Sequence, residues 1–318
     1  MTADLPDRLR RLAASMAVPQ TLTAAGLHDR FGDPNQLEPA VGQVWRAEWS
    51  NVSRLVLLLG AQERHWRVAP VSVEPTGEDD HGLVISAGHT GFPVEVTVWV
   101  GLATSIPTGT LSRMVDNYAS EITAWCVDMA AGTVREPPAG TRRGRPAVDA
   151  LDGSTSVRAS LADDLDTLVV APLVPVRAPA AVDLKAATAR VGLPTVVAAL
   201  DLPQSTVMKI VQGKQTATEQ QAEILAGLLG YRAEEILGAA GLPIGLAIEL
   251  EQPRWRPAWR SIARRFNVSE FAARLRAGSG TYAMAFRQTG AAAPNWRSRI
   301  DQWLAANGGQ TSGAEHDK

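Results

Sequence analysis

Residues 204–214 hold the side chains of this chain that are best suited to recognition chemistry. They are amides, hydroxyls, a thioether and amines, and most of them would share one face of a helix. The set is Gln204, Ser205, Thr206, Met208, Lys209, Gln212 and Lys214. Met208 and Ser205 could contact thymine methyl groups or base edges, and Lys209 and Lys214 could hold phosphates. The stretch therefore predicts a surface that contacts duplex DNA.

The apolar residues around this stretch predict two short helices that meet at a tight turn. Three of them would face inward from the first helix, one would fill the turn, and two would face back from the second helix. They are Val196, Val197, Leu200, Leu202, Val207 and Ile210. Gly213 would end the second helix, since glycine adopts the left-handed conformation easily.

This segment resembles the lambda-repressor/Cro-type (XRE) helix-turn-helix family over about residues 184–237. The matching residues are Val196, Leu200, Leu202, Ser205, Thr206, Val207, Ile210, Gly213 and Lys214. The sequence departs from the family at Asp201, where glycine is preferred, and at Pro203, which replaces a hydroxyl cap. The resemblance implies sequence-specific DNA binding by a homodimer, with residues 204–212 in a major groove.

Charge is the weak point of this interpretation. The chain has a formal net charge of -2 and a pI of about 6.2, so phosphate contacts need a local source. One source is the arginine-rich segment after Pro253, with Arg254, Arg256, Arg260, Arg264 and Arg265. Trp255 and Trp259 lie between them and could anchor a flat surface. The alternative is a helical bundle with a solvated arginine face and a tryptophan core, to which Trp296 and Trp303 would belong.

A second source of positive charge is the segment from Arg143 to Pro146. Arg143-Gly144-Arg145-Pro146 resembles the core of an AT-hook, in which an extended Arg-Gly-Arg lies in a narrow minor groove. Short motifs of this kind are also common in linkers rich in arginine and proline. Both interpretations remain open from the sequence.

The N-terminal half contains a different set of candidate residues. Short Val-, Leu-, Ile- and Trp-rich runs from Gly42 predict five or six strands, and residues 108–130 are predicted as a helix. This part resembles, more faintly, the MazF/PemK-like toxin barrel. The resemblance implies RNA cleavage through Arg54 and Ser72. The glycine-rich loop that normally precedes the arginine is missing, which favours an interaction or dimerisation module.

The fold class predicted from these patterns is α+β. A small β-barrel-like domain would precede a linker and an all-α domain with the helix-turn-helix and an Arg/Trp-rich helical extension. The predicted segments are a helical segment 1–38, a β-rich barrel 39–131, a linker 132–181, a DNA-binding domain 182–250, the extension 251–304 and a disordered tail 305–318. One short helix is expected in the linker, around residues 160–168.

Other chemistry is limited. Cys126 is the only cysteine, which excludes an intrachain disulfide, and the five histidines lack zinc-ligand spacing. No cofactor or metal is expected, and Asp79-Asp80-His81 is predicted to be a solvated loop. Without a leader or a long apolar run, the protein is expected to be cytoplasmic and not bound to a membrane.

These observations favour a bacterial-type transcriptional regulator that binds DNA as a homodimer. One alternative is a metal-independent endoribonuclease toxin with a Cro-like autoregulatory domain. A third possibility is an adaptor whose helix-turn-helix no longer binds DNA and serves a protein partner. A protein partner could also bind the N-terminal barrel.

Overall fold

The computed structural model describes residues 19–34, 36–74, 78–149, 152–177, 182–213, 215, 217–233, 235–236, 241–286 and 294–307. The chain divides into two compact units, residues 1–171 and residues 172–318. The first contains an antiparallel sheet and the second is helical, so the expected mixed α+β class is confirmed. Residues 1–18 of the predicted helical segment and residues 308–318 of the predicted tail lie outside the described residues, whereas residues 305 and 306 of that tail are helical.

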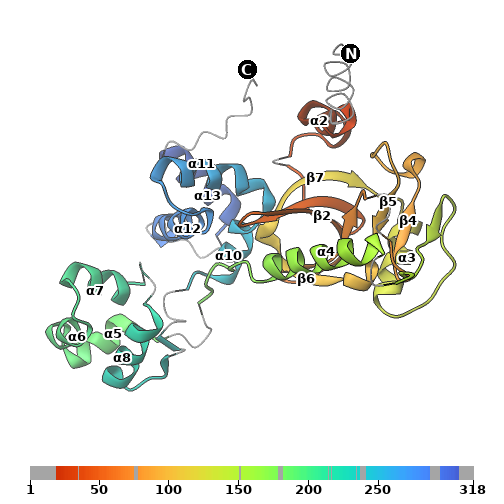
Figure 1. Cartoon of the computed structure of the whole chain (residues 1–318). Helices are drawn as coiled ribbons and strands as arrows, with labels where there is room; N and C mark the ends of the chain where they lie inside the picture. The colour runs from red at the N-terminus through yellow and green to blue at the C-terminus, as the bar shows by residue number, and fades with distance from the viewer. Residues whose placement is uncertain are drawn as a thin grey trace, which may run out of the picture. The chain divides into compact units, whose positions relative to one another are not determined.

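Within the described residues, eight strands form one antiparallel sheet (Figure 1). They are β1 (Gln43–Trp49), β2 (Val52–Ala61), β3 (His65–Ser72), β4 (Leu83–Ile85), β5 (Val96–Val98), β6 (Thr104–Pro107), β7 (Leu111–Asn117) and β8 (Thr141–Arg143). The strand order is β7-β1-β2-β3-β5-β4-β8, and β6 pairs with the first half of β3. The expected runs correspond to β1 to β5.

Apolar residues on both faces of the central strands are buried. Leu57 and Leu59 of β2 belong to one core, whereas Val56 and Leu58 belong to another. A strand buried on both faces needs a continuous apolar run instead of an alternating one, which explains the sequence "RLVLLLG". The helices α2 (Ala24–Phe31) and α3 (Ser120–Ala130) contribute to the first core, through Leu27 and Ile122 among others.

The second core is closed by α4 (Gly153–Val169), which lies along the sheet (Figure 1). Leu165 and Leu168 of this helix are buried with Trp45 of β1. The linker predicted for residues 132–181 is corrected at β8 and at α4, and the short helix expected around residues 160–168 lies within the longer α4. The prolines and charges dominated its composition, but leucines at helical spacing supply enough apolar surface for packing.

The helix predicted for residues 108–130 is also corrected. Residues 111–117 form β7, which pairs with β1, and only residues 120–130 are helical. Leu111 and Val115 fit a helical period, yet pairing with a distant strand overrides so short a local pattern. Asp116 of β7 is buried, and it accepts bonds from Arg30 Nη2 at 2.5 Å and Gly91 N at 2.7 Å.

The second unit contains two groups of helices with separate apolar cores. The first group, here the α5–α8 module, comprises α5 (Leu184–Val191), α6 (Leu193–Leu200), α7 (Gln204–Val211) and α8 (Glu219–Leu229). The second group, the α10–α13 module, comprises α10 (Ile244–Leu250), α11 (Arg256–Phe266), α12 (Glu270–Phe286) and α13 (Trp296–Ala306). Because α10 packs in the second core, the boundary predicted at residue 250 is corrected to before Gly241.

The chain segments that precede and follow the α5–α8 module are hydrogen-bonded to each other. Val176 forms a parallel bridge with Leu242, and Arg177 N donates to Leu242 O at 2.8 Å. A Cβ atom added to Gly241 would lie 2.2 Å from the backbone of Val176, so this approach requires glycine. The α5–α8 module is thus an insertion whose two ends leave from and return to one place in the α10–α13 module.

No helix among the described residues has the length and apolar character needed to cross a lipid bilayer.

The packing of α4 on the sheet yields a stability prediction. Leu168 is fully buried, so Leu168→Ala should lower the free energy of unfolding of the first unit by about 2–5 kcal/mol. Val170→Ala is the matched control, because Val170 is 74% exposed at the end of the same helix. Denaturant unfolding of both variants measures the difference. Equal free energies of unfolding for the two variants would show that α4 does not contribute to the cooperatively folded core.

Candidate nucleic-acid interface

The turn between α6 and α7 has an unusual backbone. Helix α6 ends at Asp201, whose φ of 49° and ψ of 44° are left-handed. Pro203 precedes α7 and offers no side-chain cap, but its carbonyl accepts bonds from Thr206 N at 2.8 Å and Val207 N at 3.1 Å. Aspartate tolerates a left-handed conformation better than most residues, which allows it to replace the expected glycine.

The inward-facing residues predicted for this helix pair are confirmed. Val196, Leu200, Val207 and Ile210 are buried, and Val197 and Leu202 pack partly against the same core. Val211, which was not among the predicted residues, is buried as well. Three buried residues on α7 fix which of its sides faces away from the module.

The outward face of α7 matches the predicted set closely. Gln204, Ser205, Lys209 and Gln212 are exposed, and Thr206 and Met208 are half-buried. Lys214 lies outside the described residues. The exposed face thus has two amides, a hydroxyl and one ammonium group, with no acidic side chain on the helix.

Few charged residues of the α5–α8 module could supplement Lys209. Asp183 caps α5 by accepting a bond from Ala186 N at 3.0 Å. Arg190 donates to the hydroxyl of Tyr231 at 2.7 Å, and Arg232 pairs with Glu235 at 3.6 Å. Lys185 is exposed as well, but the described cations Lys185, Arg190 and Arg232 are offset by Asp183, Asp201, Glu223 and Glu235, so α7 gains little net positive charge for phosphate contacts.

The arginines predicted as phosphate contacts after Pro253 divide into internal and surface residues. Arg254 and Arg256 are buried, at 8% and 3% exposure, so they cannot reach a DNA backbone. Trp255 and Trp259 are buried too, which agrees with a tryptophan core and not with a surface anchor. Arg254 and Trp255 belong to a short 3-10 helix before α11 (Pro253–Trp255), Trp259 lies on the buried face of α11, and Arg264 and Arg265 in its last turn are exposed.

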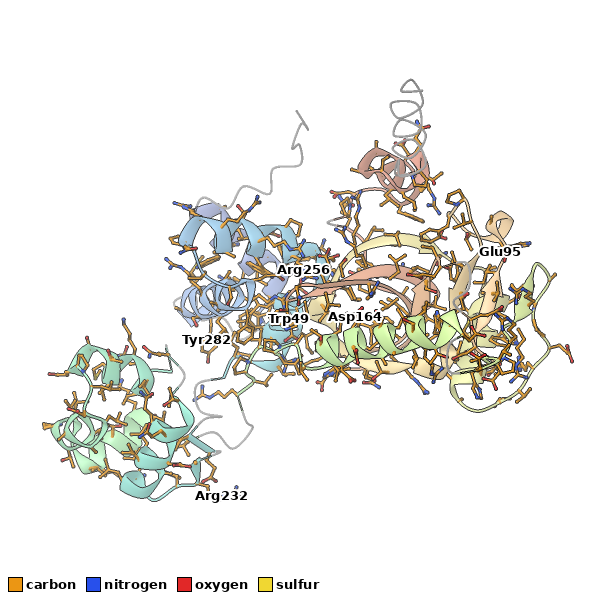
Figure 2. All side chains as sticks on the ribbon, viewed as in Figure 1. Trp49, Glu95, Asp164, Arg232, Arg256 and Tyr282 are labelled. Carbon is orange, nitrogen blue, oxygen red and sulfur yellow. The ribbon has the colours of Figure 1, made fainter. Side chains whose placement is uncertain are left out.

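Glu270 is the internal partner of three arginines in this module. Its carboxylate accepts bonds from Arg274 Nη2 at 2.6 Å, Arg256 Nε at 3.0 Å and Arg260 Nε at 3.3 Å. Burial by itself would raise the pKa of Glu270, but the guanidinium groups outweigh it and the net shift is downward. Burial lowers the pKa of Arg256 to about 10, although Glu270 opposes that shift. Figure 2 labels Arg256 at the start of α11.

The AT-hook-like segment is held against the sheet unit. Arg145 pairs with Asp152 at 3.0 Å and with Glu78 at 3.2 Å, and Arg143 Nε donates to Asp80 O at 2.6 Å. A Cβ atom on Gly144 would lie 2.2 Å from Asp79 O, so this glycine permits packing of two backbones. These contacts account for the arginines and the glycine without a minor groove.

The neighbouring loop Asp79-Asp80-His81 is exposed at Asp80 and His81, as the sequence predicts, but not at Asp79. Asp79 is buried and pairs with Arg158 of α4. Burial raises the pKa of Asp79, and the charge of Arg158 opposes that shift. Glu78 is buried beside Arg142, with which it also pairs. The acidic residues of this loop serve to hold α4 and β8 to the sheet.

The two residues of the ribonuclease alternative lie on neighbouring strands. Leu55 of β2 is opposite Val71 of β3, so Arg54 and Ser72 follow as the next opposed positions. Arg54 pairs with Asp164 of α4, which is labelled in Figure 2, and donates to Ser160 Oγ at 3.2 Å. Ser72 is buried, and its hydroxyl accepts a bond from Trp99 Nε1 at 2.8 Å. Both side chains are therefore engaged in contacts that hold the fold.

Comparisons with known proteins add no identification. No protein-family model matches the chain, and no curated protein matches it either. Within the described ranges, no three His, Cys, Asp or Glu side chains form a group that could hold a metal ion. The function therefore has to be inferred from the side chains themselves.

The left-handed residue between α6 and α7 yields a second prediction. At positive φ a Cβ atom is strained by roughly 1–2 kcal/mol, whereas glycine has none. Asp201→Ala should therefore unfold with a free energy about 1 kcal/mol lower than Asp201→Gly. Chemical denaturation of the two variants makes the comparison. Equal stability would contradict a left-handed turn at this position.

The ion pairs of Glu270 yield a prediction of pH dependence. Its folded pKa lies below its unfolded value, so its contribution is fully present above the unfolded pKa and is lost as pH falls through the folded pKa. At pH 7, Glu270→Gln should lower the free energy of unfolding by about 3–5 kcal/mol, because a buried charge partner is removed. The gap between wild type and variant should narrow as pH falls below 4.5, the ordinary pKa of a glutamate. Denaturation at a series of pH values tests this, and a constant gap would show that the carboxylate charge is not responsible.

Proposed function

We propose that the chain is a sequence-specific DNA-binding protein that inserts α7 into a major groove, and that it acts as a transcriptional regulator. The observation that carries the proposal is the exposed face of α7. Gln204, Ser205 and Gln212 offer hydrogen-bonding groups there, and Lys209 supplies a positive charge. Amides and hydroxyls on the exposed side of a short helix match the donor and acceptor pattern of base edges.

Support also comes from the way the helix is held. The buried residues of α6 and α7, together with the turn at Asp201, are consistent with the helix-turn-helix arrangement of the Cro-type family. A rigid core keeps the exposed side chains of α7 in fixed relative positions. That rigidity is what direct readout of a base sequence needs.

The sheet unit is proposed to serve assembly or a protein partner. The residues that the toxin resemblance implies as catalytic, Arg54 and Ser72, are engaged with Asp164 and Trp99. This weakens the ribonuclease alternative, since a reactive pair should be open to a phosphodiester. A barrel shape and a homodimer remain part of the proposal, the latter because helix-turn-helix proteins usually bind two half-sites.

Selection from a random pool of DNA duplexes tests the proposal. Full-length wild type should enrich one sequence, with two half-sites about 10 base pairs apart if the protein binds as a dimer. Gln204→Ala and Ser205→Ala together should reduce the preference for the selected sequence by about 1–3 kcal/mol for each base that the two side chains recognise. Binding of a scrambled duplex should change little, since neither side chain is charged.

A matched control is Gln220→Ala, which removes an exposed amide from α8 and should leave the preference intact. If the pool shows no enrichment, or if the α7 variant and the control behave alike, α7 does not read DNA.

A further inference from the structure

The corner between α11 and α12 places two arginines over an exposed aromatic ring, and a third exposed arginine, Arg264, lies in the last turn of α11. Helix α11 ends at Phe266, Asn267 takes a left-handed conformation with φ of 50°, and α12 begins at Glu270. The guanidinium carbon of Arg276 lies 4.0 Å from the centroid of the Phe266 ring, and that of Arg265 lies 5.3 Å from it. Phe266 itself is 40% exposed. We call Arg264, Arg265, Phe266 and Arg276 the Phe266 patch.

The positive charge of the Phe266 patch is not neutralised by nearby acids. Arg264, Arg265 and Arg276 are all exposed, and none of them forms an ion pair with a carboxylate among the described residues. The carboxylates of Glu249 and Glu270 are instead directed to other arginines of the module, namely Arg254, Arg256, Arg260 and Arg274. The half-buried Glu249 and Glu270 are thus occupied by other arginines, and three exposed guanidinium groups remain near the corner between α11 and α12.

Contacts within the patch hold two of its arginines, Arg265 and Arg276, in place before any ligand binds. Arg265 Nη1 donates to Asn307 O at 2.9 Å while its guanidinium lies over Phe266. Arg276 lies over the same ring. A guanidinium restrained by an aromatic ring keeps free N–H groups, so it loses less conformational entropy on binding an anion. Such an arrangement suits phosphate oxygens, which accept forked hydrogen bonds.

We propose that the Phe266 patch binds the phosphodiester backbone of duplex DNA without reading its sequence. The choice of DNA as the ligand rests on the function proposed for α7. The arrangement of the patch residues does not depend on that function. Helix α7 offers amides and hydroxyls that can contact base edges, but its only charged residue is Lys209. The Phe266 patch has several positive charges and no amide side chain. The two surfaces are chemically complementary for one ligand, since backbone contacts supply affinity and base contacts supply specificity.

Binding of a scrambled duplex over a range of salt concentrations tests this inference. Full-length Arg264→Ala/Arg265→Ala/Arg276→Ala should give a slope of log Kobs against log salt that is shallower by about 2.7, since each phosphate contact contributes about 0.9. Between about 50 and about 200 mM salt, the wild type should consequently lose ~40-fold more affinity than the variant loses. An unchanged slope and affinity would overturn the proposal.

Two control proteins separate this effect from net charge and from misfolding. Arg46→Ala/Arg67→Ala/Arg135→Ala removes three exposed arginines from the sheet unit, and its salt slope should match that of wild type. Arg264→Lys/Arg265→Lys/Arg276→Lys keeps the charge and should keep most of the slope. If the sheet-unit variant lowers the slope as much as the patch variant does, the Phe266 patch has no special role.

Further measurements distinguish failure of the patch from failure of α7. Loss of sequence preference in the Gln204→Ala/Ser205→Ala variant concerns α7 alone, whereas a change in salt slope caused by the patch substitutions, with α7 intact, concerns the patch. Poly-glutamate serves as the competitor for an acidic protein partner. DNA should displace labelled duplex from wild type, and poly-glutamate of equal charge should not. Equal displacement by both polymers would contradict a phosphate-binding surface.

Discussion

The left-handed backbone at Asp201 is the constraint on which the rest of the proposed interface depends. It ends α6, and the carbonyl of Pro203 two residues later accepts the first bonds of α7. With this corner fixed, Val207 and Ile210 enter the core beside Val196 and Leu200. Burial of these residues leaves the amides and the lysine of α7 outside. The side chains that the α5–α8 module can offer to a ligand are therefore those on the face of α7 that the core does not bury.

Burial also separates the arginines of the α10–α13 module into an internal group and a surface group. Glu270 holds Arg256 and Arg274 inside the α10–α13 module, where both are almost fully buried. Arg264 and Arg265, in the last turn of α11, form no ion pair with a described carboxylate and remain at the surface. One helix therefore contributes both to an internal charge network and to an external basic patch. The α5–α8 module is inserted into this framework where Val176 meets Leu242.

Features set by local spacing could be predicted from the sequence. The inward and outward residues of α7 and the strands β1 to β5 follow from apolar periods and turn residues. Features set by distant partners could not. Leu111 and Val115 have a helical period but lie in β7, a strand that pairs with β1, and α4 lies in a segment whose prolines suggested a linker. The burial of Arg256 depends on Glu270, fourteen residues away, and nothing in either local pattern reveals that pairing.

The most direct test of α7 as a reader helix is photo-crosslinking to DNA in which 5-iodouracil replaces thymine. The full-length protein would be irradiated with duplexes carrying the substitution at successive positions of a selected site, and the crosslinked peptides identified by mass spectrometry. We expect crosslinks within residues 204–212, with Met208 as the residue placed to meet a thymine methyl group. Crosslinks confined to other segments, with residues 204–212 unmodified at every position of the site, would contradict a reader role for α7.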